Sequence, residues 1–143
     1  MRERCRNDPE LCMQILRGLD TVKEGWCELC KLAPSKEKGY IQLSYGGANK
    51  FAMLQEVVLW AAGVTKGKGD HCSHLCCKPL CTIVGHVCGE DPKKNNERKG
   101  CVVWVDCPHC GLKILVCPHE PKCIKFAPGF SSWEAFLQNG IHK

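Results

Sequence analysis

The sequence contains no run of about 18 apolar residues, the length that a membrane-spanning helix requires, so we expect no membrane-spanning segment. The N-terminal residues MRERCRNDPE also lack the apolar stretch of a secretory signal peptide, which predicts an intracellular protein, nuclear or cytoplasmic. Long periodic apolar runs are scarce as well, since only residues 53–64 predict a helix with a solid buried face. A hydrophobic core this thin usually needs cross-links to be stable.

Cysteine and histidine, in contrast, are abundant: the 143 residues include 14 Cys and 6 His. An even number of cysteines would also suit a secreted disulfide scaffold. The cysteines, however, stand in short clusters with histidines, and zinc binds both residue types whereas a disulfide framework has no use for histidine. We therefore predict bound zinc rather than disulfides. The clusters are Cys27-x2-Cys30, Cys76-x4-Cys81-x4-His86, Cys107-x2-Cys110 and Cys117-x-His119-x3-Cys123.

The formal net charge of +5 is compatible with a nucleic-acid partner but is weak evidence for one. A zinc site of three cysteines and one histidine combines three thiolates with one Zn2+, which is a net charge of −1. Two such sites would lower the charge to about +3, so the function has to be inferred from the site residues.

Capping residues and apolar periodicity predict a single α+β domain over residues 1–143, with few helices and a short antiparallel sheet. Residues 1–24 predict an N-terminal helix with Asp8 as its N-cap. Residues 25–70 predict a turn-rich segment, then a hairpin that starts at Gly39, and then a helix.

Residues 71–123 contain most of the cysteine clusters and leave little room for regular structure. The exceptions that we expect are a short helix at 92–99 and a hairpin between Cys101 and Cys117. Residues 124–143 predict a C-terminal helix with a capping box.

The ligands divide into two sets. Cys76, Cys81 and His86 would form a tetrahedral structural site with one upstream cysteine. The second set consists of Cys101, Cys117, His119 and Cys123. With both sets assigned, His74 and Asn95 are left at the two ends of the first loop, so closure of the loop would bring them near each other.

The segment SHLC at residues 73–76 is followed by Cys81 and His86, and Asn95 stands at the start of the predicted short helix. This arrangement resembles the His-Cys box homing endonucleases, members of the ββα-metal (His-Me finger) nuclease superfamily. The second ligand set resembles that family too, except that this chain is longer between the first two ligands.

The resemblance implies a ββα-metal core and a metal-dependent endonuclease that hydrolyses phosphodiester bonds in double-stranded DNA. His74 would take a proton from the attacking water, a task that suits histidine because its ordinary pKa lies near neutral pH. Asn95 would hold one catalytic Mg2+. The two structural Zn2+ ions would take no part in cleavage, because their ligand shells are full. The family also implies a homodimer.

Two positions depart from the family pattern. The family places an arginine near the scissile phosphate, and the nearest basic residue here is Lys50, twenty residues after Cys30. That spacing favours Lys50 as the counterpart and Cys30, rather than Cys27, as the fourth ligand of the first site. Cys107 and Cys110 are an addition that could hold a third zinc, replace part of the second site or remain free.

Three other interpretations stay open at this point. His74 could be a zinc ligand, because it stands beside cysteines. The chain could also be a non-catalytic zinc-stabilised module that binds DNA or RNA, or a zinc module for protein interactions. The last two leave His74 and Asn95 without a role, which favours the endonuclease.

Overall fold

The computed structural model describes most of the chain up to residue 124, and the predicted C-terminal helix lies outside it. The described residues are 2–25, 27–36, 39–44, 51–99, 101, 104–106, 108–111, 113–115 and 117–124. The helices are α1 (Arg2–Arg6), α2 (Pro9–Arg17), α3 (Leu54–Ala61) and α4 (Pro92–Lys99). The strands are β1 (Thr21–Glu24), β2 (Cys27–Cys30), β3 (Gln42–Ser44), β4 (Phe51–Met53), β5 (His71–His74), β6 (Val87–Glu90), β7 (Trp104–Asp106) and β8 (Lys113–Leu115).

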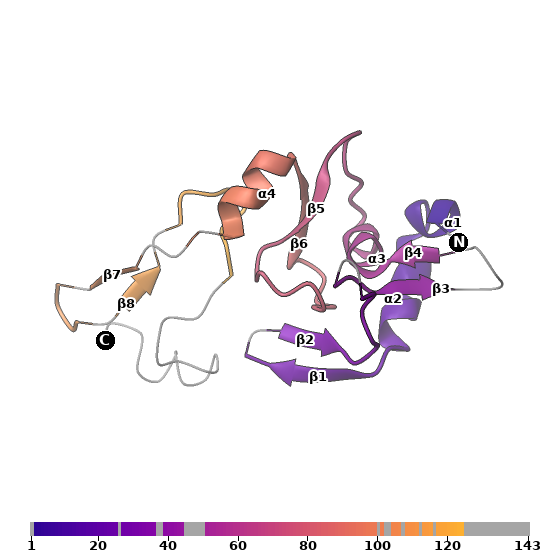
Figure 1. Cartoon of the computed structure of the whole chain (residues 1–143), viewed down its shortest axis with the longest axis horizontal. Coiled ribbons are helices and arrows are strands. Elements are labelled where there is room, and N and C mark those ends of the chain that lie inside the picture. The colour runs from indigo at the N-terminus through magenta and orange to yellow at the C-terminus, as the bar shows by residue number, and fades with distance from the viewer. Residues whose placement is uncertain are drawn as a thin grey trace.

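The strands pair as four separate two-stranded antiparallel sheets, which confirms the α+β class. In Figure 1 the helices α1, α2 and α3 lie toward one end of the molecule with β3 and β4. The pair β5–β6 and helix α4 occupy the centre, and β7–β8 lie toward the other end. Within the described residues, none of the helices has the length and apolar character needed to cross a bilayer.

The N-terminal helix begins as predicted but is shorter than predicted. The Asp8 side chain accepts a hydrogen bond from the backbone N–H of Leu11 at 2.9 Å, as an N-cap does. The helix ends at Arg17, before Gly18, and the expected helix up to residue 24 is wrong. The four residues of β1 instead pair with β2, through a turn that uses a positive φ of 58° at Gly25. Gly18 disfavours continuation of the helix, whereas Gly25 permits the tight turn.

The hydrophobic core forms where α2 packs on α3, and it also includes Leu43 of β3. Leu16 of α2, Ile41 and a row of apolar side chains on α3 are buried there, including Val57 and Trp60. The predicted helix over 53–64 is confirmed as α3, which ends before Gly63, a residue with a φ of 73°. This core stabilises the N-terminal half, so the rest of the chain needs another source of stability.

The centre of the molecule contains more regular structure than the sequence predicted. Residues 71–74 and 87–90 pair in register from His71 opposite Glu90 to His74 opposite Val87. Helix α4 follows directly, and the Asp91 side chain caps it by accepting hydrogen bonds from two backbone N–H groups. The order β5, β6, α4 is the strand–strand–helix unit that the family resemblance implies (Figure 1).

The predicted hairpin between Cys101 and Cys117 is confirmed as β7 and β8, which pair from Trp104 opposite Leu115 to Asp106 opposite Lys113. It accounts for the greater length of this chain between the first two ligands of the second set.

Candidate metal centres and active site

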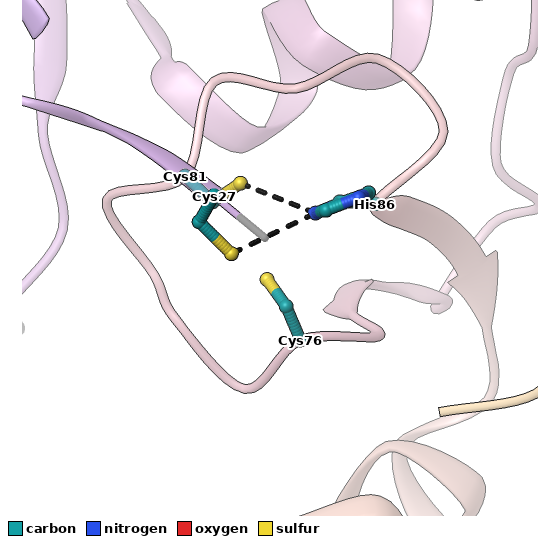
Figure 2. A group of neighbouring side chains, drawn as sticks. All are labelled: Cys27, Cys76, Cys81 and His86. Carbon is teal, nitrogen blue, oxygen red and sulfur yellow. Dashed lines mark hydrogen bonds between the residues drawn. The ribbon is translucent and has the colours of Figure 1, made fainter. Parts of the chain in front are cut away.

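Four side chains from two parts of the chain meet in the first metal centre. Their ligand atoms all lie within 4.8 Å of one another. Cys27 comes from β2, and the other three come from the loop between β5 and β6 (Figure 2). The residues of this first cluster are Cys27, Cys76, Cys81 and His86.

The distances in the first cluster fit a tetrahedral zinc ion. The Nδ1 atom of His86 lies 3.7 Å from the sulfur of Cys27 and 3.5 Å from that of Cys81. With Zn–S near 2.3 Å and Zn–N near 2.0 Å, a tetrahedron separates sulfur from nitrogen by about 3.5 Å. The donor set is therefore both chemically and geometrically suited to Zn2+, and it is complete without His74.

The charge balance of the cluster also favours a cation. Hydrogen bonds with Cys27 and Cys81, together with burial, raise the pKa of Cys76. Hydrogen bonds from Cys27 and Cys76 lower the pKa of Cys81. The shared contacts thus stabilise one thiolate among three thiols, and a divalent cation is needed to stabilise all three.

The structure corrects the choice between Cys27 and Cys30. The two residues are three positions apart on β2, so their side chains point to opposite faces of the strand. Cys27 faces the metal cluster, whereas Cys30 is buried in the hydrophobic core with the side chains of α2 and α3. Backbone hydrogen bonds from Cys30 N–H to the Leu80 carbonyl (2.8 Å) and from Thr82 N–H to the Glu28 carbonyl (2.8 Å) fix this strand beside the loop.

The second cluster contains the four residues that the sequence predicted: Cys101, Cys117, His119 and Cys123. The Nδ1 atom of His119 lies 3.4 Å from the sulfur of Cys117 and 3.6 Å from that of Cys123, again close to a tetrahedral edge. Burial opposes ionisation of Cys117, but hydrogen bonds from the backbone of Cys123 and His119 lower its pKa to about 6. Cys117 is therefore available as a thiolate ligand near neutral pH.

Arg98 joins the second cluster to the ββα unit. Its guanidinium group is fully buried, and its Nη2 atom donates to Glu90 of β6 at 2.9 Å. Its Nη1 atom donates to the Pro121 carbonyl at 2.7 Å and to the Cys123 sulfur at 3.5 Å. Although burial alone would raise the pKa of Glu90, the hydrogen bonds from Arg98 lower it, so the pair is ionised. This bridge ties α4 to both its strand and the second cluster.

His74 and Asn95 line one cavity of about 140 Å³, although they come from β5 and α4. The sequence predicted this proximity, and the structure confirms it. Tyr40 and Lys99 also line the cavity.

The environment of His74 keeps its imidazole neutral. Burial lowers the pKa of His74 to about 4, so the ring is unprotonated at neutral pH. Its Nε2 atom is buried and has no hydrogen-bond partner among the described residues. A buried nitrogen without a partner is costly, and a water molecule or a substrate group would relieve that cost.

Asn95 is held by two side chains of β5 that the sequence analysis did not single out. The Ser73 hydroxyl, fully buried, donates to the Asn95 Oδ1 atom at 2.9 Å. The Asn95 Nδ2 atom lies 3.2 Å from Nδ1 of His71. Arg98 was overlooked too, although its position three residues after Asn95 places both on one face of α4.

A family model described as the zinc-binding loop region of homing endonuclease matches residues 24–135 of this chain. The chain belongs to this homing endonuclease family. Neither the curated proteins nor the solved structures contain a significant match to it.

Membership of the homing endonuclease family confirms the resemblance seen in the sequence and sets the site in a nuclease context. The matched segment includes both metal clusters, His74 and Asn95. Since the family is defined by a zinc-binding loop, and since two clusters fit zinc, Zn2+ is the metal that these eight ligands suit.

Three further residues were predicted from the sequence as site residues: Lys50, Cys107 and Cys110. Lys50 and Cys107 lie outside the described residues, so their roles stay predictions. Lys50 was chosen because it follows Cys30 by twenty residues. That spacing no longer supports Lys50, because Cys27 and not Cys30 belongs to the cluster. Cys110 is exposed in the turn between β7 and β8, apart from both clusters of described ligands.

The first metal centre can be tested by two matched substitutions. Cys27→Ala should lower the zinc content of the purified protein by one ion per chain, because it removes a ligand. Cys30→Ala should retain the full zinc content, because Cys30 lies in the hydrophobic core. Zinc is measured by elemental analysis of the folded fraction. Loss of zinc from the Cys30 variant alone would show that the sequence-based assignment was right.

Proposed function

We propose that this protein is a Mg2+-dependent endonuclease that hydrolyses phosphodiester bonds in double-stranded DNA, with His74 as the general base and Asn95 as the Mg2+ ligand. The observation that supports this most directly is that these two residues line the same cavity, between β5 and α4 of a ββα unit. Family membership supports a nucleic-acid substrate. The proposal assigns no catalytic role to zinc.

The chemistry that we assign to His74 follows from its environment. A neutral imidazole can accept a proton without first losing one, and burial keeps His74 neutral. A water molecule placed at the unpartnered Nε2 atom would give up its proton to His74 and attack the phosphorus atom in line with the leaving 3′ oxygen.

Asn95 suits a hard divalent cation. An amide oxygen has two lone pairs, and the Ser73 hydroxyl uses one of them, which leaves the other for Mg2+. Mg2+ keeps several water ligands and completes its shell with phosphate, so a single protein ligand suffices. When bound there, the ion would supply charge neutralisation at the phosphate and the leaving oxygen.

The two zinc centres act as the scaffold in this proposal. The first includes Cys76, two residues after His74, so the metal loop fixes the end of β5. The second is joined through Arg98 to α4, which positions Asn95. Each centre therefore holds one of the two catalytic elements.

The proposed metal role is tested by Asn95→Ala. Cleavage of supercoiled plasmid DNA should fall at least about 100-fold, while the zinc content stays at two ions per chain, because Mg2+ and zinc occupy different positions. Asn96→Ala is the matched control, since Asn96 is an exposed amide next in the chain whose side chain bonds to Lys99. Equal cleavage by the Asn95 variant and the control would refute Asn95 as the Mg2+ ligand. Plasmid left intact by the wild-type protein with Mg2+ would refute the endonuclease itself and favour a binding module.

A further inference from the structure

We propose that the DNA backbone runs through a basic groove that extends from α1 to α4 across the candidate active site. The basic groove is lined by Arg6, Lys66 and Lys68 at one end and by Lys99 at the other. This inference rests on the proposed function, because it assumes that DNA occupies the cavity of His74 and Asn95. It adds a binding surface along α1, the loop before β5 and α4.

The groove consists of three cavities that share lining residues. A cavity of about 580 Å³ beside α1 shares Lys66 and Glu56 with a second cavity of about 250 Å³. The second cavity shares Tyr40, Cys72 and Asn95 with the active-site cavity. In Figure 1, α1, the loop that precedes β5 and α4 follow one another along one edge of the molecule. A polymer could therefore pass from α1 to α4 over the catalytic residues.

The charge at the α1 end fits a polyanion. Among the described residues, four basic side chains and two acidic ones, Glu3 and Glu56, line the large cavity. Glu56 is buried and bonded to Arg2, so that pair is neutral. Among the described residues, Arg6, Lys66 and Lys68 form no ion pair, and their positive charges remain for phosphate groups.

Lys66 lies at the junction of two cavities and forms no ion pair among the described residues, although Glu56 and Asp70 also line the second cavity. Its ammonium group donates to the backbone carbonyl of Asp70 at 2.9 Å, a neutral acceptor. Its stem packs on β6 at Gly89, where a Cβ atom would come within 2.8 Å of the Lys66 Cβ. The absence of a side chain at Gly89 therefore lets the loop approach β6 and sets Lys66 between α1 and Asn95.

The α4 end of the groove also has a basic side chain, that of Lys99. Lys99 lines the active-site cavity, and within the described part of the chain its ammonium group bonds to a neutral amide oxygen, that of Asn96, at 3.2 Å. Basic groups thus stand on both sides of His74 and Asn95. Phosphates recur at regular intervals along a DNA strand, so contacts on both sides would fix the register of the phosphate to be cut.

The groove is tested by removing three positive charges from it and, separately, three from elsewhere. The groove variant is Arg6→Gln/Lys66→Gln/Lys68→Gln. The matched control is Arg17→Gln/Lys23→Gln/Lys36→Gln, which makes the same chemical changes at positions that line none of the three cavities. Binding to a fluorescein-labelled DNA duplex is followed by fluorescence anisotropy at several salt concentrations without added Mg2+, so the duplex stays intact. Zinc content confirms that each variant is folded.

The groove variant should bind about 10- to 100-fold more weakly than wild type at low salt, and the slope of log Kd against log salt should fall by about 0.9 for each lost contact. The control should keep the wild-type slope. Equal affinities and slopes for the two triple variants would overturn the groove. The binding comparison does not depend on cleavage. If His74 or Asn95 proves not to be catalytic, the two triple variants should still differ in their affinity for DNA. If the two variants bind equally, the test of Mg2+-dependent cleavage is not affected.

Discussion

Replacement of His74 by alanine is expected to reduce plasmid cleavage by about two to four orders of magnitude, the usual size of a lost general base. The physical reason is that His74 provides the neutral imidazole of the cavity that it shares with Asn95. The zinc content should stay at two ions per chain, since both clusters are complete without His74. Affinity for the DNA duplex should also remain, because the basic residues are untouched.

The control for this prediction is His109→Ala, which removes an exposed imidazole from the turn between β7 and β8 and should leave cleavage at the wild-type rate. The assay is the rate of nicking of supercoiled plasmid with Mg2+. If the His74 variant lacks one zinc ion, His74 is a ligand and the catalytic assignment fails. If the variant cuts as fast as wild type, the base is another residue.

Removal of zinc is expected to unfold the protein, at least over residues 71–124. The buried cluster that joins this region to β2 consists of Cys27, Cys76 and Cys81, and the apolar side chains packed against it among the described residues are Leu29, Ile83 and Ile124. Binding of structural zinc contributes about 10–16 kcal/mol in zinc-finger peptides, which equals or exceeds the whole stability of a typical domain. Without a cation, the first cluster also cannot keep all three of its thiols ionised.

This prediction is measured by circular dichroism during titration with a strong chelator, with zinc counted by elemental analysis before and after. Signal from the zinc-bound loops should disappear as the zinc leaves, and it should return when Zn2+ is added to the reduced protein. The core of α2, α3 and β3 contains no ligand of either cluster and can persist longer. A protein that keeps its full spectrum with less than one zinc per chain would contradict the scaffold role.

Local signals in the chain were enough to predict several elements. Asp8 caps α2 and Asp91 caps α4, because capping depends on a side chain and on backbone groups only a few residues away. The second ligand set was predicted completely, since three of its four members lie within seven consecutive residues and chelate from one short loop. The proximity of His74 and Asn95 was predicted from closure of the first metal loop, which lies between them.

Long-range packing decided what the local signals could not. Whether Cys27 or Cys30 binds metal depends on which face of β2 meets the zinc loop, and that face is set by strand pairing with β1 and by backbone hydrogen bonds to the loop. The same pairing of β1 with β2 explains why residues 21–24 form a strand and not the end of the predicted helix.

The amino-acid sequence alone was sufficient to predict seven of the eight residues in the two metal clusters, and that His74 and Asn95 remain outside them. The tertiary structure alone decided how those residues are held. Arg98 links α4 to the second cluster, Ser73 orients Asn95, and burial keeps His74 neutral. Chelation is a property of residue type and short spacing, whereas burial and hydrogen bonding between distant segments exist only after the chain has packed.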